Sequence, residues 1–250
     1  MTPISVQLYS VREAAAKDFP GVLKQIAEIG YKGVEPAGPH GMAPKEVKKI
    51  LDDLGLVTSS AHMAMPNAEN VSQLVDECKT LGIPTLISGF GGDQFKTMEG
   101  CNEAIAKLKT AMSLMEGTGI RFGIHNHWWE FQPVDGQFPE DILLNNVPGL
   151  VAELDVYWAQ VGCGDAVGAV SRLKSRTPLL HCKDGMIEPK LPATAVGSGK
   201  MDIPAVVKAA DPNVLEWLVV ELDSCATDMM EAVAQSYRFL VEKGLGYGNK

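Results

Sequence analysis

Residues with catalytic or metal-binding side chains stand at the ends of short apolar runs of this sequence. The later runs end in three histidines, a lysine and three acidic residues, which are His125, His127, Asp155, His181, Lys183, Glu221 and Asp223. If such a run is a β-strand, its side chains alternate between two faces, so residues two positions apart share a face. His125 then shares a face with His127, and His181 shares one with Lys183. This spacing predicts that imidazole, carboxylate and ammonium groups gather at one end of a sheet.

Four of these residues form a donor set for a divalent metal ion. The set takes one side chain from each of four successive runs, namely His125, Asp155, His181 and Glu221. Two imidazoles and two carboxylates suit Mn²⁺, Co²⁺, Zn²⁺ or Fe²⁺, and suit Mg²⁺ less well because of the imidazoles. Each residue alone also has a structural explanation, since a strand-end histidine often packs in a hydrogen-bonded position and an acidic residue often caps the next helix. Because four of them end consecutive runs, we predict a metal site.

Polar residues at the ends of other runs are candidates for contacts with a substrate. We expect Glu35 and His62 to touch substrate hydroxyl groups, and Lys183 to polarise a carbonyl. Gln7 could simply finish the first strand. Such a set of polar groups around a metal predicts a small, sugar-like substrate.

The sequence HNHWWEF at residues 125–131 adds aromatic bulk beside the predicted ligands. Trp128, Trp129 and Phe131 could form an apolar wall against a sugar ring and exclude water. The alternative is that they cover the mouth of the fold or build an oligomer contact. Glu130 could be a further ligand, a partner that orients a histidine, or a solvated loop residue. We expect Trp128, Trp129 and Glu130 to contact the substrate.

The apolar runs alternate with helical patterns, which is the sequence sign of βα units around a parallel sheet. Eight runs are predicted to be strands, at residues 6–9, 33–36, 58–62, 86–90, 122–127, 153–156, 179–184 and 218–223. Helical spacing of apolar residues is clear at residues 19–29 and 233–241. Pro20, Pro44 and Pro204 stand where first helical turns are expected.

Eight strands in 250 residues fit one closed (β/α)8 barrel, an α/β TIM barrel that spans residues 1–250 as a single domain. Barrel enzymes place their active sites at the carboxyl ends of the strands, where the polar residues stand. The alternative is an open doubly wound sheet. Such a sheet usually has a glycine-rich turn after its first strand, and residues 10–13 (SVRE) lack one.

Residues 197–200 (GSGK) follow the seventh predicted strand, where barrels often bind phosphate. Their amides and Lys200 could hold an anion. The more economical interpretation is a simple turn that leads into a helix capped by Asp202.

Composition and charge exclude several classes of function. The net charge of −9 is spread without long blocks, whereas nucleic-acid binding needs clustered lysine and arginine. The longest apolar stretches, such as residues 215–220, are too short to span a bilayer, and the first residues do not resemble a signal peptide. The five cysteines are scattered and form no C-x-x-C pair, so we expect reduced thiols. These features predict a cytoplasmic protein without nucleic-acid or membrane partners.

Five motifs carry a resemblance to a known family. They are GYKGVEPAG at the second predicted strand, GIHNHWWEF at the fifth, ELDVYWAQVG at the sixth, HCKD at the seventh and VVELD at the eighth. Over its whole length the chain resembles the xylose isomerase-like TIM barrels of sugar phosphate isomerases and epimerases. That family also includes ketose 3-epimerases, inosose dehydratase and abasic-site endonucleases of AP endonuclease family 2. The resemblance implies a carbohydrate substrate, and a homo-oligomer such as a dimer or tetramer would agree with it.

The resemblance also implies one divalent ion, often manganese, held by Glu, Asp, His and Glu from strands five to eight. Asp155, His181 and Glu221 match the last three types, and His125 replaces the first glutamate. In the ketose epimerases the two glutamates exchange the substrate proton from opposite faces of the ring carbon, so only one of them remains here. The HNHxxEF form resembles a subgroup whose members act on 3-keto sugars or glycosides by elimination or hydration.

The leading hypothesis is metal-dependent isomerisation or epimerisation of a small ketose or keto-sugar through an enediolate. Glu221 would move a proton, and His125 or His127 would supply the opposite acid. The main alternative is a metal-dependent lyase or hydratase that expels a β-substituent from a 3-keto glycoside or inosose. A metal-dependent endonuclease is disfavoured by the net charge of −9 and by a total of only five histidines. A non-catalytic sugar-binding barrel, suggested by Trp128 and Trp129, is the remaining alternative.

Overall fold

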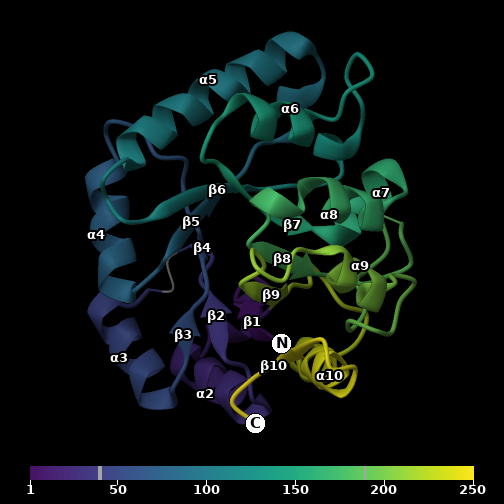
Figure 1. The fold of residues 1–250 in the computed structure, drawn as a ribbon. Coiled ribbons are helices and arrows are strands. Elements are labelled where there is room, and N and C mark those ends of the chain that lie inside the picture. Colours follow the sequence, from purple (N-terminus) through teal and green to yellow (C-terminus); the bar gives the residue numbers. More distant parts are fainter. Residues whose placement is uncertain (39–40, 189) are drawn as a thin grey trace.

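The computed structural model describes residues 1–38, 41–188 and 190–250 of the chain. Its strands stand side by side around a barrel, and helices surround them (Figure 1). In chain order the barrel strands are β1 (Thr2–Gln7), β2 (Gly33–Glu35), β3 (Val57–Thr58), β4 (Ala61–His62), β5 (Thr85–Ser88), β6 (Arg121–His125), β7 (Val151–Asp155), β8 (Leu179–Cys182) and β9 (Trp217–Val220).

The strands form one parallel sheet that is nearly closed. Hydrogen-bonded neighbours follow the order β3-β2-β1-β9-β8-β7-β6-β5-β4. A parallel bridge between Ala37, just after β2, and His62 links the β2 side of this order to β4 at its other end. The prediction of a (β/α)8 barrel is therefore confirmed.

The strands depart from the prediction at three places in the chain. The run at residues 58–62 is two short strands, because the chain changes partner at Ser59 and Ser60, from β2 to β5. The first strand lies at Thr2–Gln7 rather than at residues 6–9, because the chain turns after Gln7, where Ser10 N donates to Gln7 O. A further short strand that the pattern did not indicate, β10 (Gly246–Tyr247), pairs with the start of β1.

Helices follow most of the strands and cover the outside of the barrel. They are α1 (Arg12–Ala15), α2 (Phe19–Ile29), α3 (Pro44–Leu54), α4 (Val71–Leu81), α5 (Met98–Met115), α6 (Pro139–Asn146), α7 (Val156–Cys163), α8 (Ala166–Leu173), α9 (Ile203–Ala209) and α10 (Met229–Glu242), with 3-10 turns η1 (Gly92–Phe95), η2 (Trp129–Phe131) and η3 (Lys174–Arg176). Pro20, Pro44 and Pro204 lie in first turns, as predicted. In the described part of the chain, no helix has the length and apolar character needed to cross a membrane.

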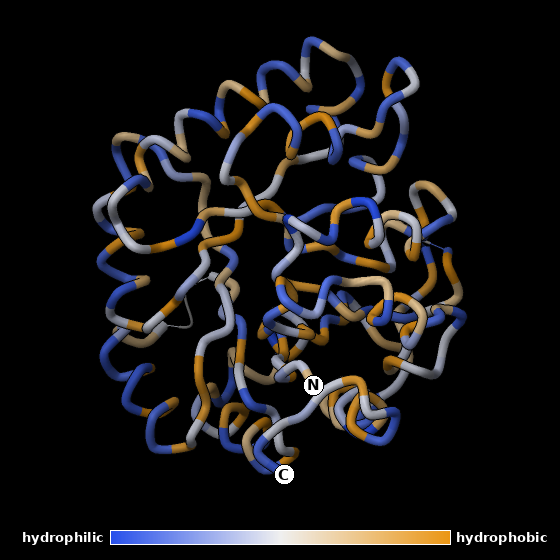
Figure 2. Tube along the Cα trace, in the orientation of Figure 1, coloured by the Kyte–Doolittle hydropathy of each residue, from blue (hydrophilic) through white to orange (hydrophobic). Residues whose placement is uncertain are grey.

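Strand alternation directs the polar side chains into the barrel. Figure 2 shows apolar and polar residues alternating along the helices that surround the strands. Leu154, Leu180 and Val220 belong to the apolar core that the strands share with the helices. Their strand neighbours therefore point the other way, into the barrel interior; these are Asp155, His181 and Glu221.

Candidate active site

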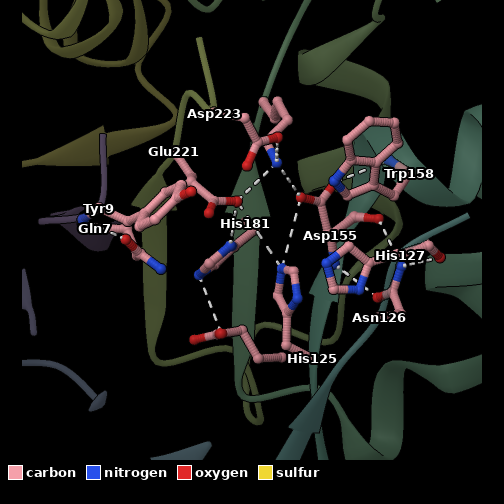
Figure 3. A network of polar contacts seen from close by, with 12 residues as sticks. Gln7, Tyr9, His125, Asn126, His127, Asp155, Trp158, His181, Glu221 and Asp223 are labelled. Atoms are coloured by element: carbon pink, nitrogen blue, oxygen red, sulfur yellow. Dashed lines mark hydrogen bonds and ion pairs between the residues drawn. The ribbon is translucent and has the colours of Figure 1, made fainter. Parts of the chain in front are cut away.

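The predicted metal ligands meet at the carboxyl ends of four adjacent strands. His125 ends β6, Asp155 ends β7, His181 lies in β8, and Glu221 directly follows β9. Parallel pairing sets Asp155 opposite His181, so these two side chains are neighbours on one face. Figure 3 shows the four side chains pointing toward one another. All four are buried.

The spacing within this group suits a metal ion better than it suits hydrogen bonds. Nε2 of His125 lies 3.6 Å from Oδ2 of Asp155 and 3.9 Å from Oε2 of Glu221. Among the described residues, the buried Nε2 of His125 has no hydrogen-bond partner, and the buried Oδ2 of Asp155 has no hydrogen bond besides its 3.0 Å ion pair with Nζ of Lys183. Because a buried polar atom without a partner is costly, Nε2 of His125 is well placed to bind an ion. The donor set thus fits a divalent ion, with Nδ1 of His181, 3.1 Å from Oε2 of Glu221, as the fourth donor atom.

A second group of two glutamates and two histidines shares His181 with the first. It consists of Glu35, His62, Glu153 and His181, whose donor atoms also lie within 4.8 Å of one another. Here the polar atoms are already paired. Nε2 of His181 lies 2.8 Å from Oε2 of Glu35, and Nε2 of His62 lies 2.5 Å from Oε2 of Glu153.

Glu153 is the member of this second group that the strand-end pattern missed. It lies two residues before Asp155 in β7 and is completely buried. The same alternation that directs Asp155 inward also directs Glu153 inward, so the signal was present in the sequence.

Burial and neighbouring charges raise the pKa values of two members of the second group, Glu35 and His181. Burial, together with the charge of Glu153, raises the pKa of Glu35 to about 7. Burial opposes a positive charge on His181, but the carboxylates of Glu153, Glu35 and Glu221 outweigh it and raise the pKa of His181 well above its usual value.

Lys183 is a buried cation next to two predicted metal ligands. Its Nζ lies 2.7 Å from Oε2 of Glu221, 3.0 Å from Oδ2 of Asp155 and 2.7 Å from Oδ2 of Asp223. Burial opposes its charge, but these carboxylates raise the pKa of Lys183. Burial also opposes ionisation of Glu221, and the ammonium of Lys183 with the imidazole of His181 nevertheless holds the pKa of Glu221 well below its usual range. Lys183 is therefore an ammonium and Glu221 a carboxylate.

His127 lies beyond the end of β6, where it stacks on Trp129 with ring centres 4.3 Å apart and an angle of 16° between the planes. Its Nδ1 is buried and has no hydrogen-bond partner among the described residues. Burial, and then the nearby His125, lower the pKa of His127 to about 3. Burial lowers the pKa of His125 as well. Both rings are therefore neutral at neutral pH, which favours proton acceptance or hydrogen bonding over the acid role that we expected.

Glu130 holds the turn that carries His127 and Trp129. Its carboxylate accepts hydrogen bonds from the backbone N–H of His127 (2.8 Å) and from Nε1 of Trp129 (2.9 Å). Burial raises the pKa of Glu130 to about 8. Both oxygens are thus used inside the turn, and of the three roles considered for Glu130 the geometry matches the one that orients a histidine.

Residues of this turn line two cavities. A cavity of about 540 Å³ is lined by His62, His125, His127 and Phe90, among others, so it borders one predicted metal ligand, His125. Trp128 and Trp129 line a neighbouring cavity of about 610 Å³. Phe131 is completely buried and packs near Phe138, with ring centres 6.0 Å apart, so the expectation that it forms part of an aromatic wall is wrong.

The GSGK sequence forms a turn rather than an anion site. The carboxylate of Asp184 accepts hydrogen bonds from the backbone N–H groups of Gly197 (2.9 Å), Gly199 (3.0 Å) and Met201 (3.0 Å). These amides are therefore not free to bind phosphate. Asp202 caps α9 through the N–H of Ala205, as the turn interpretation requires.

Solved structures share this fold over nearly the whole chain. A sugar phosphate isomerase/epimerase from Parabacteroides distasonis has a TM-score of 0.76 and 25% identity, and the match covers 98% of this chain and 95% of that one. A probable 3-DHS dehydratase, AsbF, from Bacillus anthracis has a TM-score of 0.77 and 13% identity, covering 96% and 99%. The IolI protein with a bound zinc atom has a TM-score of 0.75 and 12% identity, covering 96% and 97%.

The sequence comparisons agree with the fold. Among curated protein sequences, none matches this chain significantly. A family profile described as the xylose isomerase-like TIM barrel matches residues 23–243. Because this profile matches most of the chain and the fold is a barrel of parallel strands, the chain belongs to the xylose isomerase-like TIM barrel family.

Proposed function

We propose that this protein is a divalent-metal-dependent isomerase or epimerase that acts on a small ketose or keto-sugar. The observation that carries the proposal is the buried Nε2 of His125, which has no hydrogen-bond partner among the described residues and lies 3.6 Å from Oδ2 of Asp155 and 3.9 Å from Oε2 of Glu221. The likeness to a sugar phosphate isomerase/epimerase of 25% identity supports the substrate class, and the zinc atom named in the IolI structure supports the metal.

His125, Asp155, His181 and Glu221 would hold the ion, with Mn²⁺ as the first choice and Zn²⁺, Co²⁺, Fe²⁺ or Mg²⁺ as alternatives. When bound, the ion would act as a Lewis acid that polarises a substrate carbonyl and its neighbouring hydroxyl. The protein side chains provide binding, orientation and proton transfer around it.

Proton transfer is assigned to Glu221. Its carboxylate is ionised beside Lys183, so it can accept a proton from the carbon next to the carbonyl. The ammonium of Lys183 stays charged and would stabilise negative charge on a substrate oxygen. The ring of His127 borders the 540 Å³ cavity and would hydrogen-bond to a sugar hydroxyl group, and the half-buried ring of His62 would pack against the substrate in the same cavity.

Elimination is the second candidate, and a specific residue favours it. The resemblance leads us to expect a second glutamate at the position of His125, and that ring is buried and neutral here. With one carboxylate for proton transfer, removal of a proton followed by loss of a β-substituent needs fewer groups than proton exchange from both faces. The fold shared with a probable dehydratase is compatible with this chemistry.

Heavy-water exchange separates these candidates from each other and from a binding protein. The metal-loaded protein would be incubated with ketoses and 3-keto glycosides in D₂O, and substrate and products would be followed by NMR and mass spectrometry. Deuterium next to the carbonyl of recovered sugar supports isomerisation, and loss of water or of an aglycone supports elimination. Glu221→Gln should abolish either result. Absence of both with every sugar, although metal is bound, would refute the enzymatic proposal.

A further inference from the structure

The second group of buried polar residues, Glu35, His62, Glu153 and His181, shares His181 with the predicted metal ligands. We propose that Glu35 and Glu153 are positioning residues that hold the proton of His181 on Nε2, so that Nδ1 is the atom offered to the metal. The inference rests on the proposed metal function. It assigns this second group as a support for the metal centre and not as a second metal site.

The ring of His181 stands between two sets of acidic groups. Nε2 lies 2.8 Å from Oε2 of Glu35 and 3.1 Å from Oε2 of Glu153. Nδ1, on the opposite side, lies 3.1 Å from Oε2 of Glu221. A nitrogen that faces two carboxylate oxygens must carry the hydrogen, because a lone pair there would repel both. By the same argument Nδ1 donates to the carboxylate of Glu221 while no ion is bound; an ion at Nδ1 would displace that hydrogen and leave in place the one on Nε2, which faces two carboxylates.

A chain of hydrogen bonds from the first strand determines the proton on His62 as well. The backbone N–H of Tyr9 donates to Oε1 of Gln7 at 2.6 Å, which leaves the amide nitrogen of Gln7 facing Nδ1 of His62 at 3.5 Å (Figure 3 shows Gln7 and Tyr9 beside the site). Since an amide nitrogen can only donate, Nδ1 of His62 accepts, and Nε2 carries the hydrogen. His62 therefore donates to Glu153, whose Oε2 lies 2.5 Å away.

Glu35 receives its hydrogen bonds from two directions. The hydroxyl of Ser60 donates to its Oε1 at 2.6 Å, and Nε2 of His181 donates to its Oε2 at 2.8 Å. Each carboxylate of the group thus has at least one close donor, and both are completely buried. The two glutamates hold the ring of His181 at a definite angle within the barrel.

Pairing distinguishes this group from the predicted metal ligands. Among the four predicted metal ligands, Nε2 of His125 lacks a hydrogen bond to any described residue, and Oδ2 of Asp155 has only its ion pair with Lys183. In the second group, the histidine nitrogens and the carboxylate oxygens that face each other are already within hydrogen-bond distance. A second ion bound through Nε2 of His181 would require that ring to lose its last proton. The second group is therefore better suited to orient the metal ligand His181, as carboxylates generally do for metal-bound histidines.

Metal affinity tests this inference. Apo wild type, Glu35→Gln and Glu153→Gln would be titrated with Co²⁺, whose visible spectrum reports ligand number and geometry, and with Mn²⁺ in competition with a chelating dye. Both variants should bind either ion about 10–100-fold more weakly, because a glutamine is a weaker hydrogen-bond acceptor than a carboxylate. Glu35→Asp, which keeps the carboxylate, should recover part of the affinity.

Glu140→Gln is the matched control. Glu140 in α6 is also completely buried, and it lies outside both groups. It should bind both ions within about twofold of wild type, because it touches no ligand. A purely structural role for Glu35 and Glu153 would lower the melting temperature of the apo variants and leave the affinity of the folded protein unchanged.

Three results would overturn the inference. The first is wild-type affinity in both glutamine variants, and the second is two ions per wild-type chain with one lost in those variants. The third, no metal in wild type under any condition, would remove the proposed function too. By contrast, weakened binding in the variants together with no reaction of any sugar would refute the proposed function alone.

Discussion

Nζ of Lys183 lies 2.7 Å from Oε2 of Glu221, and both side chains are buried. The ammonium also contacts Asp155 and Asp223, so it balances part of the negative charge that a metal ion would balance. Lys183→Met should therefore destabilise the apo protein by about 3–5 kcal/mol, as loss of one partner of a buried ion pair does. Added Mn²⁺ should restore more stability to this variant than to wild type.

Urea unfolding with and without Mn²⁺ measures both effects of Lys183→Met. Lys208→Met, a change at an exposed lysine of α9, is the control and should stay within about 0.5 kcal/mol of wild type. A loss of stability that is the same with and without metal would argue against shared charge balance.

Metal content is the first property to measure in the purified protein. Elemental analysis should find about one transition-metal ion per chain, because the donor set takes one ligand from each of four strands. His181→Ala and Glu221→Ala should lose the ion while remaining folded by circular dichroism. The exposed Glu242→Gln should keep it. Retention of the ion in both ligand variants would show that it binds elsewhere.

His127→Gln should separate catalysis from metal binding. The ring of His127 borders the cavity but is not among the four predicted ligands, so metal affinity should stay within about twofold of wild type. The rate of deuterium exchange or of elimination should fall about 10-fold, because the hydrogen bond between the His127 ring and a sugar hydroxyl group is lost. Since the pKa of His127 is about 3, any fall in the wild-type rate between pH 5 and 7 should remain in the variant. Disappearance of that pH dependence would contradict a neutral His127.

Glu140 should make the protein less stable as the pH rises. Burial, together with the charge of Glu130, raises the pKa of Glu140 well above its usual 4.5, and neither carboxylate oxygen has a hydrogen-bond partner among the described residues. Above pH 4.5 the unfolded chain releases this proton while the folded protein keeps it, so folding stability falls by about 1.4 kcal/mol per pH unit from this group until the folded pKa is reached.

Glu140→Gln should remove that contribution. Its stability relative to wild type should be greater at pH 8 than at pH 5, as measured by urea unfolding at both values. Glu242→Gln, an exposed change, should show no such difference. An equal effect of Glu140→Gln at the two pH values would mean that Glu140 is ionised in the folded protein.

Strand alternation made the four predicted metal ligands recognisable from the sequence. His125, Asp155, His181 and Glu221 each follow an apolar residue that packs toward the helices, so a period of two directs them inward. The same rule covers Glu153, which ended no run and was therefore overlooked. Parallel strands also explain why these residues meet, since their carboxyl ends lie on one side of the barrel.

Contacts across the barrel and conformations of loops were not predictable in this way. Glu35 meets His181 only because β2 and β8 face each other across the closed interior, a distance that depends on the whole barrel. Asp184 occupies the amides of the GSGK turn because the loop folds back on it. Trp128 and Trp129 follow His127 directly in sequence, but η2 turns them toward another cavity.

The predicted ligands lie in or directly after four different strands, from β6 through β9. An unfolded or half-folded chain therefore offers a metal ion only separate side chains. The four ligands come together only when β9, which Glu221 directly follows, has joined the sheet. An ion that binds so late would leave the speed of folding unchanged and would retard unfolding. For this protein, the metal would lengthen the lifetime of the folded state against heat and proteases without helping the chain to reach it.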